Sequence, residues 1–140
     1  MKILLALDSS EKAIDEAIKL AREKSAFLTG IFVLDSTWNE YIGHDWLSGS
    51  NARAGFLDYV KNEEDLEAKH VIEKFEVRAA GIPHESKTVA GRVPDAISRE
   101  LATGYDILVM GYPFRRGLEV VRDPLPKILK GSNCSVLLVR

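Results

Sequence analysis

Asp8 is the first side chain in the sequence whose type and position could serve a chemical function. It directly follows the apolar run Ile3–Leu7 and precedes Ser9 and Ser10. A carboxylate at the end of a strand could accept hydrogen bonds from a ribose or from the edge of an adenine ring. It could equally join the serines in capping the helix that follows, because Asp and Ser are favoured N-cap residues. Both interpretations of Asp8 stay open.

A second group of residues capable of chemistry begins at Gly111. Because glycine has no Cβ, Gly111 lets a ligand or another backbone approach closely, although a plain turn would use glycine too. Arg115, Arg116 and Arg122 then bring three guanidinium groups to one loop, and guanidinium geometry suits phosphate and carboxylate. These arginines could form an anion site, while a solvated basic loop is the simpler interpretation.

The residues after this loop disfavour a phosphate site at the next helix. Such a site needs free backbone N–H groups and no competing negative charge. Asp123 would occupy the N-cap with its own carboxylate, and Pro124 and Pro126 have no N–H. The sequence therefore predicts a poor phosphate cradle here.

No catalytic or metal-binding constellation is predicted. His44, His70 and His84 are not paired at the spacing of metal ligands. No Gly-x-Ser-x-Gly turn is present, so no catalytic residue is assigned. Whether the chain is an enzyme stays open, with a non-enzymatic role favoured.

These residues must be positioned by alternating strands and helices. Short apolar runs predict parallel strands buried on both faces, and apolar residues three or four apart predict the helices between them. The expected strands are Ile3–Leu7, Phe27–Leu34, Glu85–Val89, Tyr105–Met110 and Ser135–Val139. The first expected helix is capped within Asp8-Ser9-Ser10 and ends near Lys24. The others run from Phe56 to Ala80, Val93 to Leu101, and Asp123 or Pro124 to Lys130. The predicted fold is α/β, a three-layer open parallel five-stranded sheet with helices on both faces, flavodoxin-like or Rossmann-like.

In such a sheet the ligand crevice lies beyond the carboxyl ends of the strands, where the strand order reverses. Asp8, Asp35, Gly91 and the loop after Met110 would share this rim, and Gly91 is expected to turn the chain into the next helix. In residues 36–55 the apolar residues do not recur at helix or strand spacing. The segment contains glycines and aromatic side chains, namely Gly43, Gly49, Gly55, Trp38, Tyr41 and Trp46. The segment is predicted to form a long loop that covers the crevice, binds a protein partner or folds back on itself.

Length and composition are those of one ordinary globular domain, residues 1–140, with 46% hydrophobic and 29% charged residues. A net charge of -2 provides no overall field for nucleic acid or anionic lipid. The apolar runs are far shorter than the roughly 20 residues of a membrane helix. Nucleic acid and membranes are therefore not expected partners.

The single cysteine, Cys134, cannot form an internal disulfide and predicts a cytoplasmic protein.

Several segments, taken together and in order, resemble the universal stress protein family along nearly the whole chain. Each segment is weak evidence alone, but all follow the family's order and spacing. The matching segments are Ile3–Ser10, Ile31–Asp35, Val89–Ile97, Tyr105–Gly111 and Cys134–Arg140. The resemblance implies the fold predicted above and a homodimer formed through the C-terminal strand.

Some members of that family bind ATP through a glycine signature after the fourth strand. It consists of Gly, two residues, Gly, nine residues, then Gly followed by Ser or Thr. Here Gly111 supplies the first glycine, but Phe114 stands at the second. Because the chain from Gly111 to the final strand is about two residues shorter than the family pattern, the closing pair falls on or near Arg122 and Asp123. ATP or another adenine nucleotide is therefore expected to bind weakly or not at all.

The adenine end of the site resembles the family better than the phosphate end does. Asp8, Val33, Met110 and Gly111 match positions where the family's binders hold adenine and ribose, although Val33 and Met110 would be apolar strand residues in any such fold. The candidate cofactor-binding residues are Asp8, Val33, Met110, Gly111, Arg115 and Arg122.

Two functions stay open. The favoured one is a non-enzymatic stress-response or signalling domain that acts as a dimer through partner or weak ligand binding, since Val136–Val139 would form an apolar sheet edge. The alternative is an adenine-nucleotide-binding switch with at most slow hydrolysis. A phosphoacceptor receiver domain is set aside, because Leu7 replaces its first acidic residue and Ala90-Gly91 stands where its acceptor Asp would be.

Overall fold

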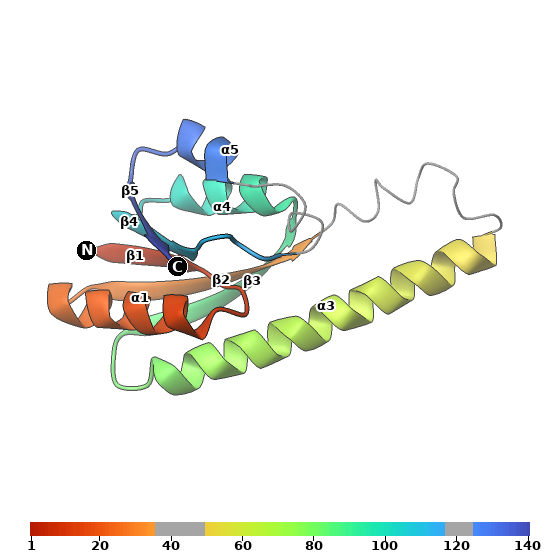
Figure 1. Cartoon of the computed structure of the whole chain (residues 1–140), viewed down its shortest axis with the longest axis horizontal. Coiled ribbons are helices and arrows are strands. Elements are labelled where there is room, and N and C mark those ends of the chain that lie inside the picture. The colour runs from red at the N-terminus through yellow and green to blue at the C-terminus, as the bar shows by residue number, and fades with distance from the viewer. Residues whose placement is uncertain (36–49, 117–124) are drawn as a thin grey trace.

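The computed structural model describes residues 1–35, 50–116 and 125–140; within residues 50–60 it describes the backbone and the Tyr59 side chain. One parallel sheet has the order β3-β2-β1-β4-β5. Its strands are β1 (Lys2–Ala6), β2 (Phe27–Asp35), β3 (His84–Gly91), β4 (Ile107–Gly111) and β5 (Ser135–Val139). Helices α1 (Glu11–Lys24) and α3 (Ser50–Arg78) lie on one face, and α4 (Val93–Leu101) and α5 (Leu125–Lys130) lie on the other (Figure 1). The predicted three-layer α/β fold is confirmed.

The central strand β1 is buried from both sides of the sheet. Ile3 and Leu5 belong to the apolar cluster under α1 and α3, whereas Leu4 and Ala6 belong to the cluster under α4 and α5. Successive side chains of a strand point to opposite faces, so a strand covered on both faces needs apolar residues at every position. This explains the unbroken apolar run at the start of the sequence.

Helix α1 begins and ends where the sequence predicts. The Ser10 side chain accepts a hydrogen bond from the Ala13 backbone N–H over 3.1 Å, and Ser25 closes the helix with a left-handed φ of 49°. The apolar stripe is buried as expected, namely Ala13, Ile14, Ala17, Ile18 and Ala21. The predicted ends of the five strands differ from the observed ends by at most two residues. Gly91, expected as a turn into the next helix, is instead the last residue of β3, paired with Asp35 of β2.

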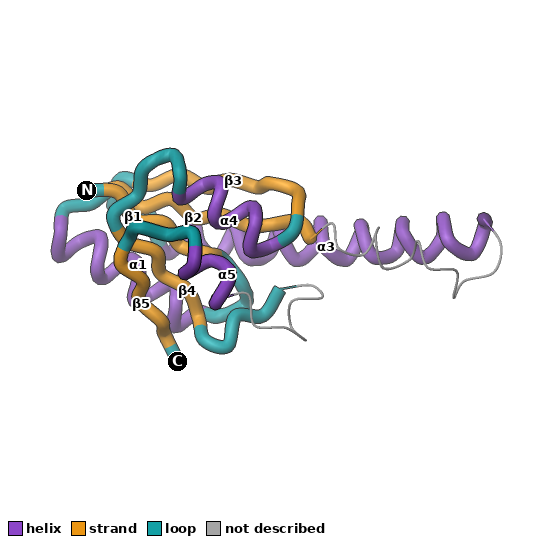
Figure 2. Tube along the Cα trace, turned by 90° about the horizontal axis from the view of Figure 1, so that it is seen from above, coloured by secondary structure: helices purple, strands orange, loops and turns teal. Residues whose placement is uncertain are grey.

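Helix α3 is longer than predicted. Residues 50–55, which the sequence placed in the long loop, form its first turns, so that part of the loop prediction is wrong. No proline interrupts Ser50–Arg78, and a glycine such as Gly55 inside a helix costs only about 1 kcal/mol. The rest of the predicted loop, residues 36–49, lies outside the described residues. The N-terminal half of α3 projects well beyond the sheet (Figures 1 and 2).

The C-terminal half of α3 packs closely on β2. Phe75 is fully buried, and a Cβ added at Gly30 would come within 2.9 Å of the Phe75 ring. Because Gly30 has no side chain, the Phe75 ring can pack directly against the backbone of β2. Within the described residues no helix is long and apolar enough to cross a bilayer.

His84 joins the end of α3 to the start of β3. Its Nδ1 lies 2.8 Å from the Ile82 carbonyl oxygen, and its Nε2 lies 2.8 Å from Glu76 Oε2. Both neighbours are acceptors, so both contacts are hydrogen bonds only when the imidazole carries two protons. The pKa of His84 is raised chiefly by the bond to the Ile82 carbonyl, with Glu76 adding to this and burial opposing it.

We expect the stability of the protein to fall as pH rises through the raised pKa of folded His84. A raised folded-state pKa means that the contribution is complete below the ordinary histidine pKa of about 6.5 and lost at higher pH. Urea unfolding between pH 5 and 9 should show this fall in the wild type but not in His84→Gln. His70→Gln, which changes an exposed histidine of α3, is the control, and an equal effect there would refute the assignment.

Candidate functional site

The strand order places the predicted crevice at the carboxyl ends of β1 and β4. These neighbouring strands lead to α1 and α5 on opposite faces of the sheet, which is where ligands bind in open α/β folds. The structure brings Asp8, Gly111 and Arg115 together at this edge. A Cβ added at Gly111 would lie 3.4 Å from Ser10 Cβ and 3.5 Å from Asp8 Oδ2, so β4 passes close to the turn after β1.

Asp8 is only 3% exposed, and its carboxylate binds two backbone groups of its own chain. Oδ1 accepts a hydrogen bond from the Ser10 N–H over 2.9 Å, and Oδ2 accepts one from the Arg115 N–H over 3.1 Å. Ser10, rather than Asp8, is the N-cap of α1. Asp8 therefore shapes the turn before α1 and ties the loop after β4 to it.

Val33 is bound at the same edge by a residue that sequence reasoning did not select. The Arg116 guanidinium donates from Nη2 to the Val33 carbonyl oxygen over 2.6 Å and to Glu64 Oε2 over 2.6 Å. Its Nη1 lies 3.0 Å from Glu67 Oε2, and its Cζ lies 3.8 Å from the centre of the Phe32 ring. Arg116 thus joins the loop after β4 to both β2 and α3.

Burial distinguishes Arg116 from its neighbour Arg115. The Arg116 residue is 1% exposed, whereas Arg115 is exposed and reaches the site through its backbone N–H. In the sequence the two arginines are adjacent and belong to one basic loop, and no periodic pattern indicates which of them points inward. The nearest signal was the acidic run of α3, which contains Glu64 and Glu67.

Two donors of the buried guanidinium remain without a hydrogen bond in the part of the chain that the structure describes. These are Nε and Nη1 of Arg116, the second of which is close to Glu67 but not aligned for a hydrogen bond. Unsatisfied buried donors are costly, so they mark a place where a further acceptor oxygen would be stabilised.

The side chains of Met110 and Phe114 lie in the apolar core. Met110 is 1% exposed and Phe114 is 4% exposed, and both belong to the apolar cluster under α4 and α5. Phe114 therefore anchors the loop where the family signature has its second glycine. Arg122, Asp123 and Pro124 lie outside the described residues, while Pro126 falls in the first turn of α5.

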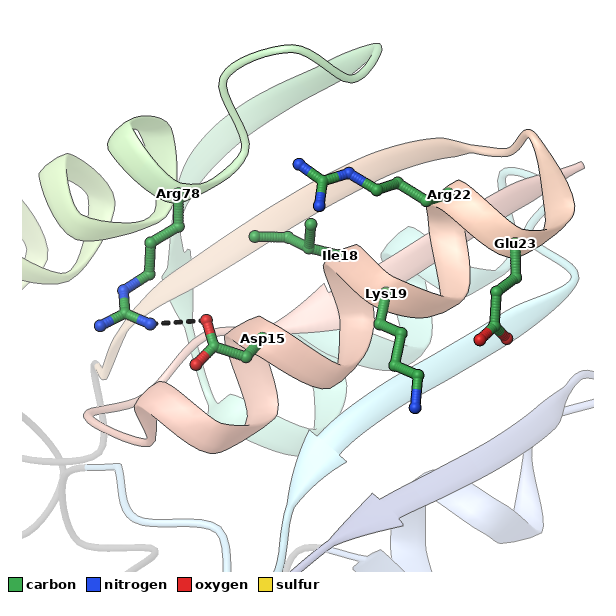
Figure 3. A pocket seen from close by; sticks show the side chains of 6 residues that line it. All are labelled: Asp15, Ile18, Lys19, Arg22, Glu23 and Arg78. Carbon is green, nitrogen blue, oxygen red and sulfur yellow. Dashed lines mark hydrogen bonds and ion pairs between the residues drawn. The ribbon is translucent and has the colours of Figure 1, made fainter.

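A hollow of about 380 Å³ lies elsewhere, between α1 and the end of α3 (Figure 3). Its lining residues are Asp15, Ile18, Lys19, Arg22, Glu23 and Arg78. Arg78 pairs with Asp15 across it, and none of the candidate site residues contributes to it. In the described ranges no three His, Cys, Asp or Glu side chains are grouped as metal ligands. The site of interest is therefore the edge around Asp8 and Arg116.

Comparison with known proteins identifies the family. The model of the universal stress protein family matches residues 1–140. The chain belongs to the universal stress protein family. Universal stress protein YxiE of Bacillus subtilis is 24% identical over 157 residues, covering 99% of this chain and 98% of that protein. The recognition made from the sequence segments is confirmed, and membership supports a role in the stress response.

Solved structures of the family share the fold at low identity. Universal stress protein UspA from Lactobacillus plantarum superimposes with a TM-score of 0.74 at 20% identity, covering 100% of this chain and 97% of that one. A universal stress protein in complex with cAMP superimposes with a TM-score of 0.65 at 16% identity, covering 100% and 97%. These universal stress proteins therefore have the same sheet and helix arrangement.

Proposed function

We propose that this universal stress protein acts as a homodimer through partner or weak ligand binding, and that it performs no nucleotide chemistry. The observation that carries this proposal is that the chain's own loop engages the crevice. The Arg115 N–H binds Asp8, and the Arg116 guanidinium binds the Val33 carbonyl. An adenine nucleotide that used Asp8 or the Val33 carbonyl would have to displace these contacts, which makes tight binding unfavourable. The low cysteine content supports a cytoplasmic location.

The edge strand β5 supports the proposed homodimer. β5 pairs only with β4 in the described sheet, and Leu137 and Leu138 are 37% and 39% exposed. The opposite edge, β3, carries the charged residues Glu85 and Lys87, which discourage pairing with another strand. An uncharged apolar edge is the better surface for a second copy, which would present the same strand.

We expect Leu138→Glu to weaken the dimer, because a carboxylate would be buried without a partner at the new interface. The weight-average mass in sedimentation equilibrium should fall, with the dissociation constant rising about tenfold or more. Leu129→Glu is the matched control, since Leu129 is 47% exposed on α5, away from this edge. A monomeric wild type, or an equal fall in the control, would contradict dimerisation through β5.

An adenine-nucleotide-binding switch is the second candidate function. Two observations favour it: the unsatisfied Nε and Nη1 donors of Arg116 could bind a ligand oxygen, and a structural neighbour was solved with cAMP. Against it, Glu64 and Glu67 already surround that guanidinium with negative charge and would repel a phosphate.

A further inference from the structure

The outer side of α3 carries three large apolar side chains in one line. Tyr59, Leu66 and Val77 are 62%, 54% and 76% exposed. They are separated by seven and eleven residues, close to two and three whole helical turns, so they share one side of the helix. We call this line the outer ridge of α3.

The outer ridge lies opposite the side of α3 that packs on the sheet. The inner side is formed by Ala68, Val71 and Phe75, all buried in the cluster under α1 and α3, and Ala79 directly after the helix joins them there. A helix on the surface of a globular protein normally turns charged and polar residues away from the core. Single exposed apolar residues are ordinary, but an aligned set on a helix that projects beyond the sheet indicates a contact surface (Figure 1).

We propose that two copies of this chain also pair through α3, antiparallel, with a two-fold axis at Leu66. This interface is additional to the β5 dimer proposed above, so the two together would join β5 dimers into larger assemblies. The projecting half of each helix would then lie along the outer ridge of the other copy's anchored half. Each sheet stays on the inner side of its own α3, so the two sheets are separated by both helices and do not collide.

Charge complementarity selects this arrangement. An axis at Leu66 places residues at equal sequence distance on either side of it opposite one another, because an isologous interface uses the same surface twice. Glu63 then faces the partner's Lys69, and Asn62 faces the partner's His70. Tyr59 can donate its hydroxyl proton to the partner's Glu73. All six of these residues are exposed.

Other helix pairings bring like charges together. In a parallel pair with a two-fold axis, each residue faces the same residue of the partner. Glu63 would then face the partner's Glu63, and Glu73 would face the partner's Glu73. An antiparallel pair centred two residues further along, which would match Tyr59 with Val77, places Glu63 opposite Glu73. Like charges facing each other across an interface destabilise it. The axis at Leu66 avoids both contacts.

Cysteine cross-linking tests the position of the axis directly. In a Cys134→Ser background, three single variants of full-length protein are treated with a short bis-maleimide: Leu66→Cys, Tyr59→Cys and Val77→Cys. All three positions are exposed on the same ridge, so they are matched in reactivity. In the proposed pair, the two copies of residue 66 meet, whereas those of residue 59 are about 21 Å apart and those of residue 77 about 33 Å apart along the helix.

We expect efficient dimer formation from Leu66→Cys and at least tenfold less from the other two variants. Equal cross-linking at all three positions would indicate a parallel pair. An absence of cross-linking at Leu66 would mean that the ridge serves another partner or none. Either result overturns the proposal.

Charge exchange provides a second, independent measurement. In the Leu138→Glu background, which weakens the β5 contact, Glu63→Lys should raise the dissociation constant of the α3 pair about tenfold, because Lys would face Lys twice. The double change Glu63→Lys with Lys69→Glu should restore it. If the double variant does not recover the original dissociation constant, this register is refuted. If β5 is not a dimer interface, Leu138→Glu alone will leave the weight-average mass unchanged, so the two proposals fail in different measurements.

Discussion

Replacing Arg116 with alanine is expected to lower the free energy of unfolding by about 3–5 kcal/mol, the usual cost of removing one partner of a buried ion pair. The substitution leaves Glu64, whose side chain is 12% exposed, without its cation and leaves the Val33 carbonyl without its donor. Urea denaturation followed by circular dichroism measures the loss.

Arg115→Ala is the matched control for this prediction. The Arg115 side chain is exposed and its backbone N–H is unchanged by the substitution, so the effect should be within about 0.5 kcal/mol. Arg116→Lys should fall between the two, because it keeps the charge but lacks a fork that reaches both the carbonyl and the carboxylates. Similar losses for Arg115→Ala and Arg116→Ala would show that the inward position of Arg116 does not hold the loop.

Phe114→Ala is expected to cost a similar amount, about 3–5 kcal/mol, because it removes a buried aromatic ring from the core. Phe114 is 4% exposed and packs in the cluster that also contains Met110, Leu125 and Ile128. The measurement is again the free energy of unfolding, with Leu129→Ala on the exposed side of α5 as the control.

The variant Phe114→Gly restores the second glycine of the family signature. It therefore tests whether nucleotide binding is limited by the loss of that glycine or by the contacts of the loop with Asp8 and Val33. If that glycine alone limits nucleotide binding, Phe114→Gly should bind Mg-ATP. We expect no binding, because Asp8 and the Val33 carbonyl remain engaged by Arg115 and Arg116. A dissociation constant in the micromolar range for this variant would show that the loop contacts are not the barrier.

Most of the fold could be predicted because the spacing of apolar residues along the sequence reflects which side of each strand or helix is buried. The run Ile3–Leu7 predicted a strand covered on both faces, and the stripe of α1 predicted one buried helix side. The start of α3 could not be predicted in the same way. Its projecting first turns do not pack on the sheet, so they leave no apolar stripe, and Gly49 and Gly55 suggested a loop.

The candidate site was predicted in its position but not in its contacts. Asp8 and Gly111 lie together because Asp8 follows β1 and Gly111 ends the neighbouring parallel strand β4, which is a consequence of topology. Arg116 could not be told from Arg115 because its burial depends on the long-range partners Glu64 and Glu67 on α3 and the Phe32 ring on β2. The local sequence of the loop does not indicate those partners.

The central claim is that the chain's own loop occupies the polar groups at the crevice and leaves no tight nucleotide site. Calorimetric titration of the purified full-length protein with Mg-ATP, ADP, AMP and cAMP tests it most directly, together with analysis of denatured protein for nucleotide carried through purification. We expect no carried nucleotide and dissociation constants no tighter than about 1 mM, or about -4 kcal/mol. A dissociation constant in the low micromolar range, about -8 kcal/mol, would contradict the claim and establish the nucleotide switch instead.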